Sequence, residues 1–330
     1  MKKLRGTRRA FSSTLGAAAL LGLASLAVAQ DFPARGKPIR IVVGFTAGGG
    51  TDGQARIVAQ KLGEVLGTSV IVDNKPGAST MLAANEVSRA LPDGYTLLYA
   101  PSSTMAQNPH TFNQVPYDPF KDFTAISMGG RGPLVLSLST SVPVNSVKEL
   151  VAYVKAHPGK VSYASFGAGT SSHIYGEAFV KKTGIDAVHI PYKGGSAAVT
   201  DLLGGRLDFM AINPLEVAGH VGSGALRALA VLNHNGSRLL PGVPTARSLG
   251  VNVQATVWWG LVAPAGTPPA VVQALNQALN KSLAQPAVQQ KLADIGASPM
   301  GGTPAEFGAF IQAESAELGE VIRAANIRAD

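Results

Sequence analysis

The stretch PIRIVVGFTAGGGTDG, residues 38–53, decides the fold class. Its first half is a short run of β-branched residues, which is typical of a buried strand. Its second half is a glycine-rich loop, and the following ARIVAQKLGEVLG has the apolar spacing of an amphipathic helix. Further along, SVIVD, TMLAANEVSRA and YTLLYA continue this alternation. The pattern predicts parallel βαβ units and therefore an α/β fold.

The same alternation restarts after a loop rich in Asn, Pro and Tyr at residues 108–123. It continues from PLVLSLS through VSYASF to LRALAVL. Two α/β units of about a hundred residues each fit the usual size of a domain. We therefore expect two domains, with the chain crossing between them twice: domain 1 from residues 30–130 and 256–330, and domain 2 from residues 131–255.

The last segment of the chain predicts a long helix that returns to domain 1. Thr303 and Glu306 form a capping-box pattern that places the start of this helix. Its apolar residues recur at helical spacing, so one face is expected to be buried. These residues are Phe307, Phe310, Ile311, Leu318, Val321 and Ile322.

The first 29 residues have the pattern of a signal peptide. Five Lys and Arg residues precede an apolar run, and the small-residue site Ala27-Val28-Ala29 follows it. Cleavage there would leave Gln30 as the first residue of an exported protein. Arg8-Arg9 also resembles a twin-arginine signal, so both the Sec and the twin-arginine routes to the periplasm stay open.

Composition excludes several classes of protein. The signal segment contains five positive and no negative residues, so the formal net charge falls from +8 to +3 when it is removed. No cluster of Lys and Arg with interleaved aromatics remains, and we expect no nucleic-acid partner. The chain has no cysteine, and its six histidines have no metal-binding spacing. We therefore expect neither a metal nor a cofactor.

The glycine-rich loop after the first strand has three interpretations. Glycines let a backbone approach a ligand, and amides at the start of a helix attract an anion such as a carboxylate. The loop could instead be a purely structural turn. Gly48, Gly50 and Gly53, with Asp73 twenty residues beyond, also match a dinucleotide fingerprint, although four residues separate its first glycine from the strand end.

A second loop of small residues, SFGAGTSSH at residues 165–173, follows a strand of domain 2. Ligands in open α/β sheets bind at the carboxyl ends of strands, so two such loops predict a cleft that takes a ligand from both sides. The alternative is a purely structural role, in which Thr170, Ser171 or Ser172 only caps a helix. Ser102-Ser103-Thr104, after another strand, could likewise contact the ligand or only cap a helix. His173 could touch the ligand or serve only to pack its helix.

Eleven motifs in order resemble one family over residues 38–327. They include KPIRIVVGFTAGGGTD, VIVDNKPGA, PDGYTLL, YASFGAGTSSH, HIPYKGG, DLLGGRLDFM and WWGLVAPAGTP. The sequence is similar to the Bug-type receptors, the extracytoplasmic solute receptors of tripartite tricarboxylate transporters. Many members have tryptophan in the last helix where Leu318 stands here.

The resemblance implies a two-domain periplasmic binding protein, type II-like, with the ligand cleft between its α/β domains. It implies a monomer that captures a small carboxylate by domain closure, catalyses nothing, and delivers its ligand to membrane permease subunits or a sensing partner. The rival hypothesis is an exported oxidoreductase with a nucleotide cofactor. The ligand-binding residues implied are Phe45, Thr46, Ala47, Gly48, Gly49, Gly50, Thr51, Asp52, Ser103, Thr104, Gly167, Ala168, Gly169, Thr170, Ser171, Ser172, His173 and Asn213.

Overall fold

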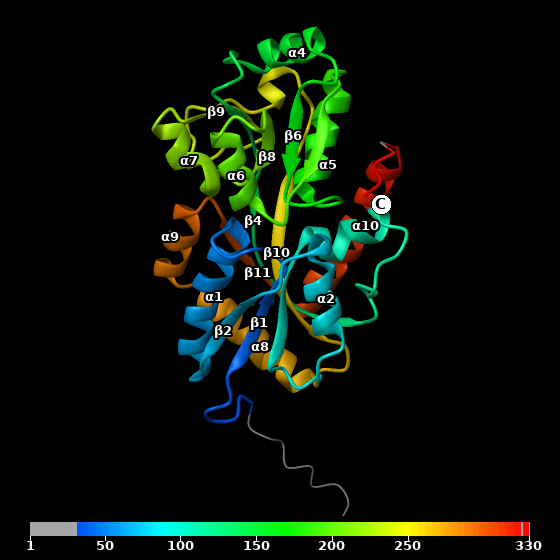
Figure 1. The fold of residues 1–330 in the computed structure, drawn as a ribbon. Helices are drawn as coiled ribbons and strands as arrows, with labels where there is room; N and C mark the ends of the chain where they lie inside the picture. The colour runs from blue at the N-terminus through cyan, green and yellow to red at the C-terminus, as the bar shows by residue number, and fades with distance from the viewer. Residues whose placement is uncertain (1–31, 325, 330) are drawn as a thin grey trace, which may run out of the picture. The chain divides into compact units, whose positions relative to one another are not determined.

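The computed structural model describes residues 32–324 and 326–329 (Figure 1). The predicted signal peptide therefore lies outside the described residues. Arg35–Asp330 form one compact unit, which contains the two β-sheets discussed below. No helix in the described ranges is both long and apolar enough to cross a bilayer.

The first sheet has six strands, and the strand predicted from residues 38–43 lies next to one edge of it. β1 pairs in parallel with both β2 and β3, as the βαβ pattern predicts. β10 lies antiparallel between β3 and β4, and β11 pairs antiparallel with β4. In spatial order the strands are β11 (Ser298–Gly301), β4 (Phe123–Pro133), β10 (Thr256–Pro264), β3 (Thr96–Pro101), β1 (Ile39–Val43) and β2 (Val70–Asn74).

The second sheet has five strands. β6 pairs in parallel with β7 and β8, whereas β5 is antiparallel to β8 and β9. In spatial order the strands are β7 (Val188–Pro191), β6 (Ser162–Ser165), β8 (Phe209–Ile212), β5 (Val135–Ser139) and β9 (Leu226–Val231).

The chain passes between the sheets twice. It leaves the first sheet where β4 ends at Pro133 and β5 begins at Val135, and it returns through residues 232–255, between β9 and β10. β4 and β10 run side by side, with Thr256 opposite Pro133 and Pro264 opposite Phe123 (Figure 1). The prediction of parallel units is wrong for β5, because β5 enters its sheet from such a connection and not from a crossover helix. β10, which the sequence predicts only as one further strand, is antiparallel to β3 for the same reason. The predicted domain boundaries stay a prediction.

Helices alternate with the strands as the sequence predicts. The α-helices are α1 (Gly50–Leu66), α2 (Met81–Ser88), α3 (Asn108–Thr111), α4 (Val147–Ala156), α5 (Ser171–Thr183), α6 (Gly195–Leu203), α7 (Pro214–Gly222), α8 (Pro269–Leu283), α9 (Pro286–Asp294) and α10 (Pro304–Ala324). Two 3-10 turns, at Ala78–Thr80 and Arg247–Leu249, and a π-helical turn at Ser103–Gln107 complete the described elements.

The last helix, α10, packs against the first sheet. The Glu306 amide donates to Thr303 Oγ1 (3.1 Å), and the Thr303 amide donates to Glu306 Oε2 (2.8 Å), so the predicted capping box is confirmed. Leu318 and three of the other predicted apolar residues join a core that also contains Trp258 of β10. Val321 is an exception, because it is 44% exposed. Leu318 itself is buried.

Candidate functional site

Two loops meet between the sheets, and each joins a parallel strand to a helix. The first loop, Gly44–Gly49, connects β1 to α1, and the second loop, Phe166–Thr170, connects β6 to α5. The ring centroids of Phe45 and Phe166 are 6.1 Å apart with an interplanar angle of 67°. The two glycine-containing loops that the sequence singled out therefore lie face to face, with the amino ends of α1 and α5 behind them.

Three cavities lie along this contact, and Phe45 and Phe166 line all of them. We call the space between the two loops the two-loop cleft. One cavity of about 20 Å³ also contacts Asn213 and Glu216, and one of about 10 Å³ also contacts Ser103 and Ser171. The third, about 630 Å³, extends along Ser79, Tyr192 and Lys193. The two small cavities have room for little more than a water-sized group, so a larger ligand enters them only when the loops separate.

Asp52, in the first turn of α1, fixes the first loop. It is 3% exposed, and its Oδ2 accepts hydrogen bonds from the Gly48 amide and from Arg56 Nε, both 2.9 Å. Asn74 Nδ2 donates to its Oδ1 (3.0 Å). Burial alone would raise the pKa of Asp52, but these hydrogen bonds favour the carboxylate and lower its pKa. The Asp52 carboxylate thus holds the loop in place, and Asp52 is not among the residues that line the three cavities.

The glycines of the first loop serve different purposes. Gly48 has φ +83°, which favours glycine, and a Cβ on Gly50 would lie 2.8 Å from Asn213 Nδ2. Gly49 has φ −79°, and a Cβ added there would lie 3.6 Å or more from its neighbours. The backbone at Gly49 could therefore accept any residue, and what glycine contributes here is the space that a side chain would otherwise fill in the cleft.

The hydroxyl groups of the second loop are engaged within the protein. Thr170 Oγ1 donates to the Gly167 carbonyl (2.7 Å), and Ser172 Oγ donates to the Ala211 carbonyl. Ser171 Oγ lies 3.0 Å from Ser102 Oγ and accepts a hydrogen bond from Gln107 Nε2 (3.0 Å). Thr170 is the N-cap residue of α5, but its side chain caps no amide. These hydroxyls hold the loop and connect it to the first sheet's side of the cleft.

His173 lies behind the second loop. Its ring stacks on that of His189 with centroids 3.8 Å apart, and its Nδ1 accepts a hydrogen bond from the Gly169 amide (3.0 Å). His189 Nε2 in turn lies 2.7 Å from Ser165 Oγ. Burial lowers the pKa of His173 to about 4 and that of His189 to about 3. Of the two interpretations of His173, these contacts favour packing of the loop.

The predicted site residues fall into two groups. Ser103 lines the cleft, whereas the hydroxyl of Thr104 is buried 2.6 Å from Thr80 Oγ1. The cavities bring together Phe45, Thr46, Gly49, Gly50, Thr51, Ser103, Gly167, Ala168, Thr170, Ser171 and Asn213. The residues that lie behind this lining are Ala47, Gly48, Asp52, Thr104, Gly169, Ser172 and His173.

Two residues of the cleft, Ser79 and Glu216, were not predicted from the sequence. Ser79 Oγ donates to the Ala168 carbonyl (2.5 Å), so it joins the second loop to the segment before α2. Glu216 lines the cavity beside Gly49 and Gly50. The only signal for Glu216 was its place three residues after Asn213, in NPLE at a helix start.

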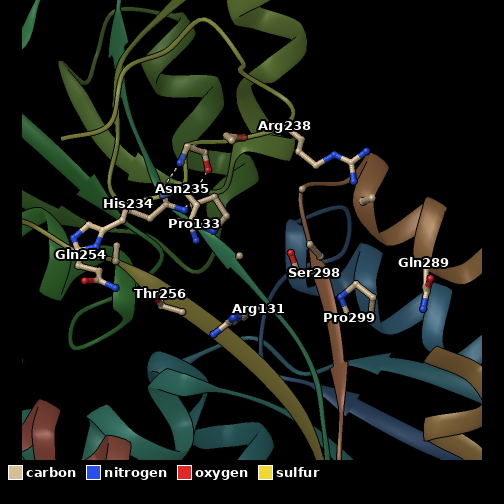
Figure 2. A pocket seen from close by; sticks show the side chains of 18 residues that line it. Arg131, Pro133, His234, Asn235, Arg238, Gln254, Thr256, Gln289, Ser298 and Pro299 are labelled. Carbon is tan, nitrogen blue, oxygen red and sulfur yellow. Dashed lines mark hydrogen bonds between the residues drawn. The ribbon is translucent and has the colours of Figure 1, made fainter. Parts of the chain in front are cut away.

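A larger cavity, about 700 Å³, lies at the connections between the sheets (Figure 2). Arg131, His234 and Arg238 are spread around it, together with the start of β11 at Ser298. The two-loop cleft is nevertheless the candidate ligand site. Two strand ends and the amino ends of two helices converge there, which is where ligands bind in open α/β sheets.

The dinucleotide hypothesis required Asp73 to be available to a ribose. Arg40 Nη1 lies 2.9 Å from Asp73 Oδ2 and 2.5 Å from Glu86 Oε1, so Asp73 is part of an ion-pair network beside β2. Within the described part of the chain, no group of three or more His, Asp or Glu side chains could hold a metal ion.

A family model described as "Tripartite tricarboxylate transporter family receptor" matches residues 54–327. The chain belongs to this family. The curated protein BugT of Bordetella pertussis is 37% identical over 307 residues, which cover 92% of this chain and 94% of BugT. The members named here are solute receptors and not enzymes, so the oxidoreductase hypothesis is set aside.

Solved structures of family receptors have the same fold. A structure described as a periplasmic transporter is 38% identical, with a TM-score of 0.86, and covers 91% of this chain and 100% of its own. The periplasmic binding protein BugD is 32% identical, with a TM-score of 0.85, and covers 88% and 98%. A protein of R. palustris with adipate is 33% identical, with a TM-score of 0.86, and covers 90% and 99%. The predicted fold, a two-domain α/β periplasmic binding protein, is confirmed.

Proposed function

We propose that this receptor works in the periplasm and captures a small carboxylate between its first and second loops. The observation that carries the proposal is the meeting of these loops at Phe45 and Phe166, each loop at the carboxyl end of a strand and at the amino end of a helix. Backbone amides at a helix start are donors to an anion, and the macrodipole adds a partial positive charge there. The adipate-bound relative supports a carboxylate as the ligand.

The mechanism that we propose is capture by closure. The two loops follow strands of different sheets, and the chain connects these sheets through two passages, at residues 133–135 and 232–255. A carboxylate that contacts both loops stabilises the closed arrangement by its extra affinity for it. We further propose the division into residues 30–130 with 256–330 and residues 131–255 as the two moving bodies.

The partners in this proposal are the membrane permease subunits of a tripartite tricarboxylate transporter, or a sensing protein that recognises the closed receptor. The receptor itself is proposed to act as a monomer. Export by the Sec or the twin-arginine route would remove residues 1–29, and the mature protein would begin at Gln30.

A thermal-shift screen tests the proposed ligand class. Mono-, di- and tricarboxylates, amino acids and aromatic acids are each added to the purified receptor at about 1 mM, and hits are titrated by calorimetry. A ligand present at 100 times its dissociation constant adds about 2.7 kcal/mol to the free energy of unfolding, which raises the melting temperature measurably. If neutral analogues such as the corresponding amides stabilise the receptor as much as the acids, the proposal is wrong.

A further inference from the structure

The carboxyl group of Glu216 lies inside the two-loop cleft. Glu216 is in the first turn of α7, and it lines the same cavity as Thr46 and Gly49 of the first loop. A Cβ on Gly195, the first residue of α6, would collide with Glu216 Oε2. The absence of a side chain at Gly195 therefore leaves the room that the Glu216 carboxyl group occupies.

The two oxygens of this carboxyl group have different surroundings. Oε1 accepts hydrogen bonds from Asn213 Nδ2 (3.3 Å) and from the Gly50 amide (3.5 Å). Oε2 is buried and has no hydrogen-bond partner among the described residues. A buried acceptor without a partner costs free energy, so it marks a position where a donor is missing from the protein itself.

We propose that Glu216 Oε2 selects a carboxylate that also carries a protonated amine, and that it accepts a hydrogen bond from this ammonium group. This inference rests on the proposed function, because the loops are assigned the carboxylate of the same ligand. It narrows the ligand class from carboxylates in general to amino-carboxylates.

The charges around Glu216 favour a cation as the partner of Oε2. Both groups that contact Oε1 are donors, which is the environment of a carboxylate. The amino ends of α1, α6 and α7 lie at Gly50, Gly195 and Pro214, and each favours the ionised form. A second ligand carboxylate placed beside Oε2 would meet a like charge, whereas an ammonium group supplies both the donor and the opposite charge.

The size of the cavity fits the same group. The cavity that Glu216 lines has a volume of about 20 Å³, which is enough for a group the size of a water molecule. An ammonium group has this size and a carboxylate does not. Among the residues that line this cavity in the described chain, Glu216 is the only ionisable one.

Proton exchange gives the proposal a distinctive signature. Burial raises the pKa of Glu216 to about 7, against the lowering effect of its bonds to Asn213 and Gly50. An ammonium group beside Oε2 would lower this pKa again, so binding at pH 6.5 would release a proton. The charged and titratable groups on the surrounding elements are Asp52, Arg56, Lys61 and Glu64 on α1, Lys193 before α6, Asp201 on α6, Arg206 after α6, and His220 on α7.

The experiment compares ligand pairs that differ by one ammonium group: succinate with aspartate, and glutarate with glutamate. Affinities are measured by calorimetry at pH 6.5 in two buffers of different ionisation enthalpy, for the wild type, Glu216→Gln and Glu320→Gln. Glu320 lies exposed on α10 and controls for the loss of one negative charge. We expect the wild type and Glu320→Gln to prefer the amino member of a pair and to release a proton on binding it.

In Glu216→Gln we expect the preference for the amino member to fall at least tenfold and the proton release to disappear. Gln has nearly the same shape, and circular dichroism checks that the variant folds. If the wild type binds the dicarboxylates as well as the amino acids, or if Glu216→Gln keeps the preference, this inference is overturned and the proposed function stands. If no member of either pair and no other carboxylate binds, the proposed function fails instead.

Discussion

The ring of Phe45 meets the ring of Phe166 edge to face, with 6.1 Å between their centroids. Phe45 follows β1 of the first sheet and Phe166 follows β6 of the second, so this aromatic pair connects the two sheets at the mouth of the two-loop cleft. Three further hydrogen-bond contacts cross the cleft: Thr46 Oγ1 with Ser196 Oγ (3.4 Å), Ser79 with Ala168, and Ser102 with Ser171. Each of them joins a residue on the first sheet's side of the cleft to a residue on the second sheet's side.

The first prediction is that ligand compacts the receptor and leaves it a monomer. Contacts such as the Phe45–Phe166 pair form only when the loops meet, so a ligand that needs both loops shifts the receptor toward the closed form. Small-angle scattering with and without a carboxylate hit should show a smaller radius of gyration at unchanged molecular mass. An unchanged radius at saturation contradicts capture by closure.

The second prediction concerns Gly49. Its φ of −79° suits any residue, and the nearest atom to a Cβ there is the Thr46 carbonyl oxygen at 3.6 Å, so Gly49→Val should fold. The added methyl groups would occupy the cavity of about 20 Å³ beside Gly49 and block the ligand. We expect calorimetry to detect no binding, while the circular dichroism spectrum stays that of the wild type.

Asp73→Ala is the matched control for the first loop. It removes the carboxylate that a dinucleotide would need, but Asp73 is engaged with Arg40 outside the cleft. We expect the affinity for the carboxylate to stay within a few-fold of the wild type. Wild-type affinity in Gly49→Val, or a large loss in Asp73→Ala, would show that the ligand lies elsewhere.

Local patterns in the sequence were enough to predict the fold and the two loops. The β-branched run at residues 39–43, the glycines after it and the Thr303–Glu306 capping box each depend on neighbours in the sequence. The direction of β5 and β10 was not predictable in this way, because it depends on how the chain passes between the sheets. Glu216 was missed for the same reason: its neighbours Gly50 and Gly195 are brought to it by two other helices.

The third prediction separates stability from binding in the second loop. Thr170 is buried and its hydroxyl donates to the Gly167 carbonyl, which also accepts hydrogen bonds from the Thr170 amide (3.2 Å) and from Ser165 Oγ (2.9 Å). Thr170→Ala removes one of these three donors, so we expect the free energy of unfolding, measured in urea, to fall by about 0.5 to 1.5 kcal/mol. Gly53→Ala, at a half-buried position in the first turn of α1 with its nearest neighbour at 3.9 Å, is not expected to lower stability and serves as the small-residue control. An unchanged unfolding energy in Thr170→Ala would mean that its hydroxyl is free to contact ligand.

The last prediction is that His173 and His189 lower the stability of the receptor as the pH falls below about 6.5. His173 and His189 are stacked behind the second loop, and burial lowers their pKa values to about 4 and about 3, below the usual value of 6.5. Between these limits the unfolded chain binds protons that the folded protein does not, so unfolding is favoured by about 1.4 kcal/mol per pH unit for each such proton. The stability contributed by the neutral rings is complete above pH 6.5 and is lost as the pH falls through 4. Urea unfolding at pH 7, 6 and 5 should give the same dependence of stability on pH in the wild type and in His234→Gln, whose histidine is exposed in a loop. In His189→Gln the loss of unfolding free energy per pH unit should be smaller than in the wild type by up to about 1.4 kcal/mol, which corresponds to one proton. The same pH dependence in all three proteins would contradict the assignment of the acid sensitivity to this pair.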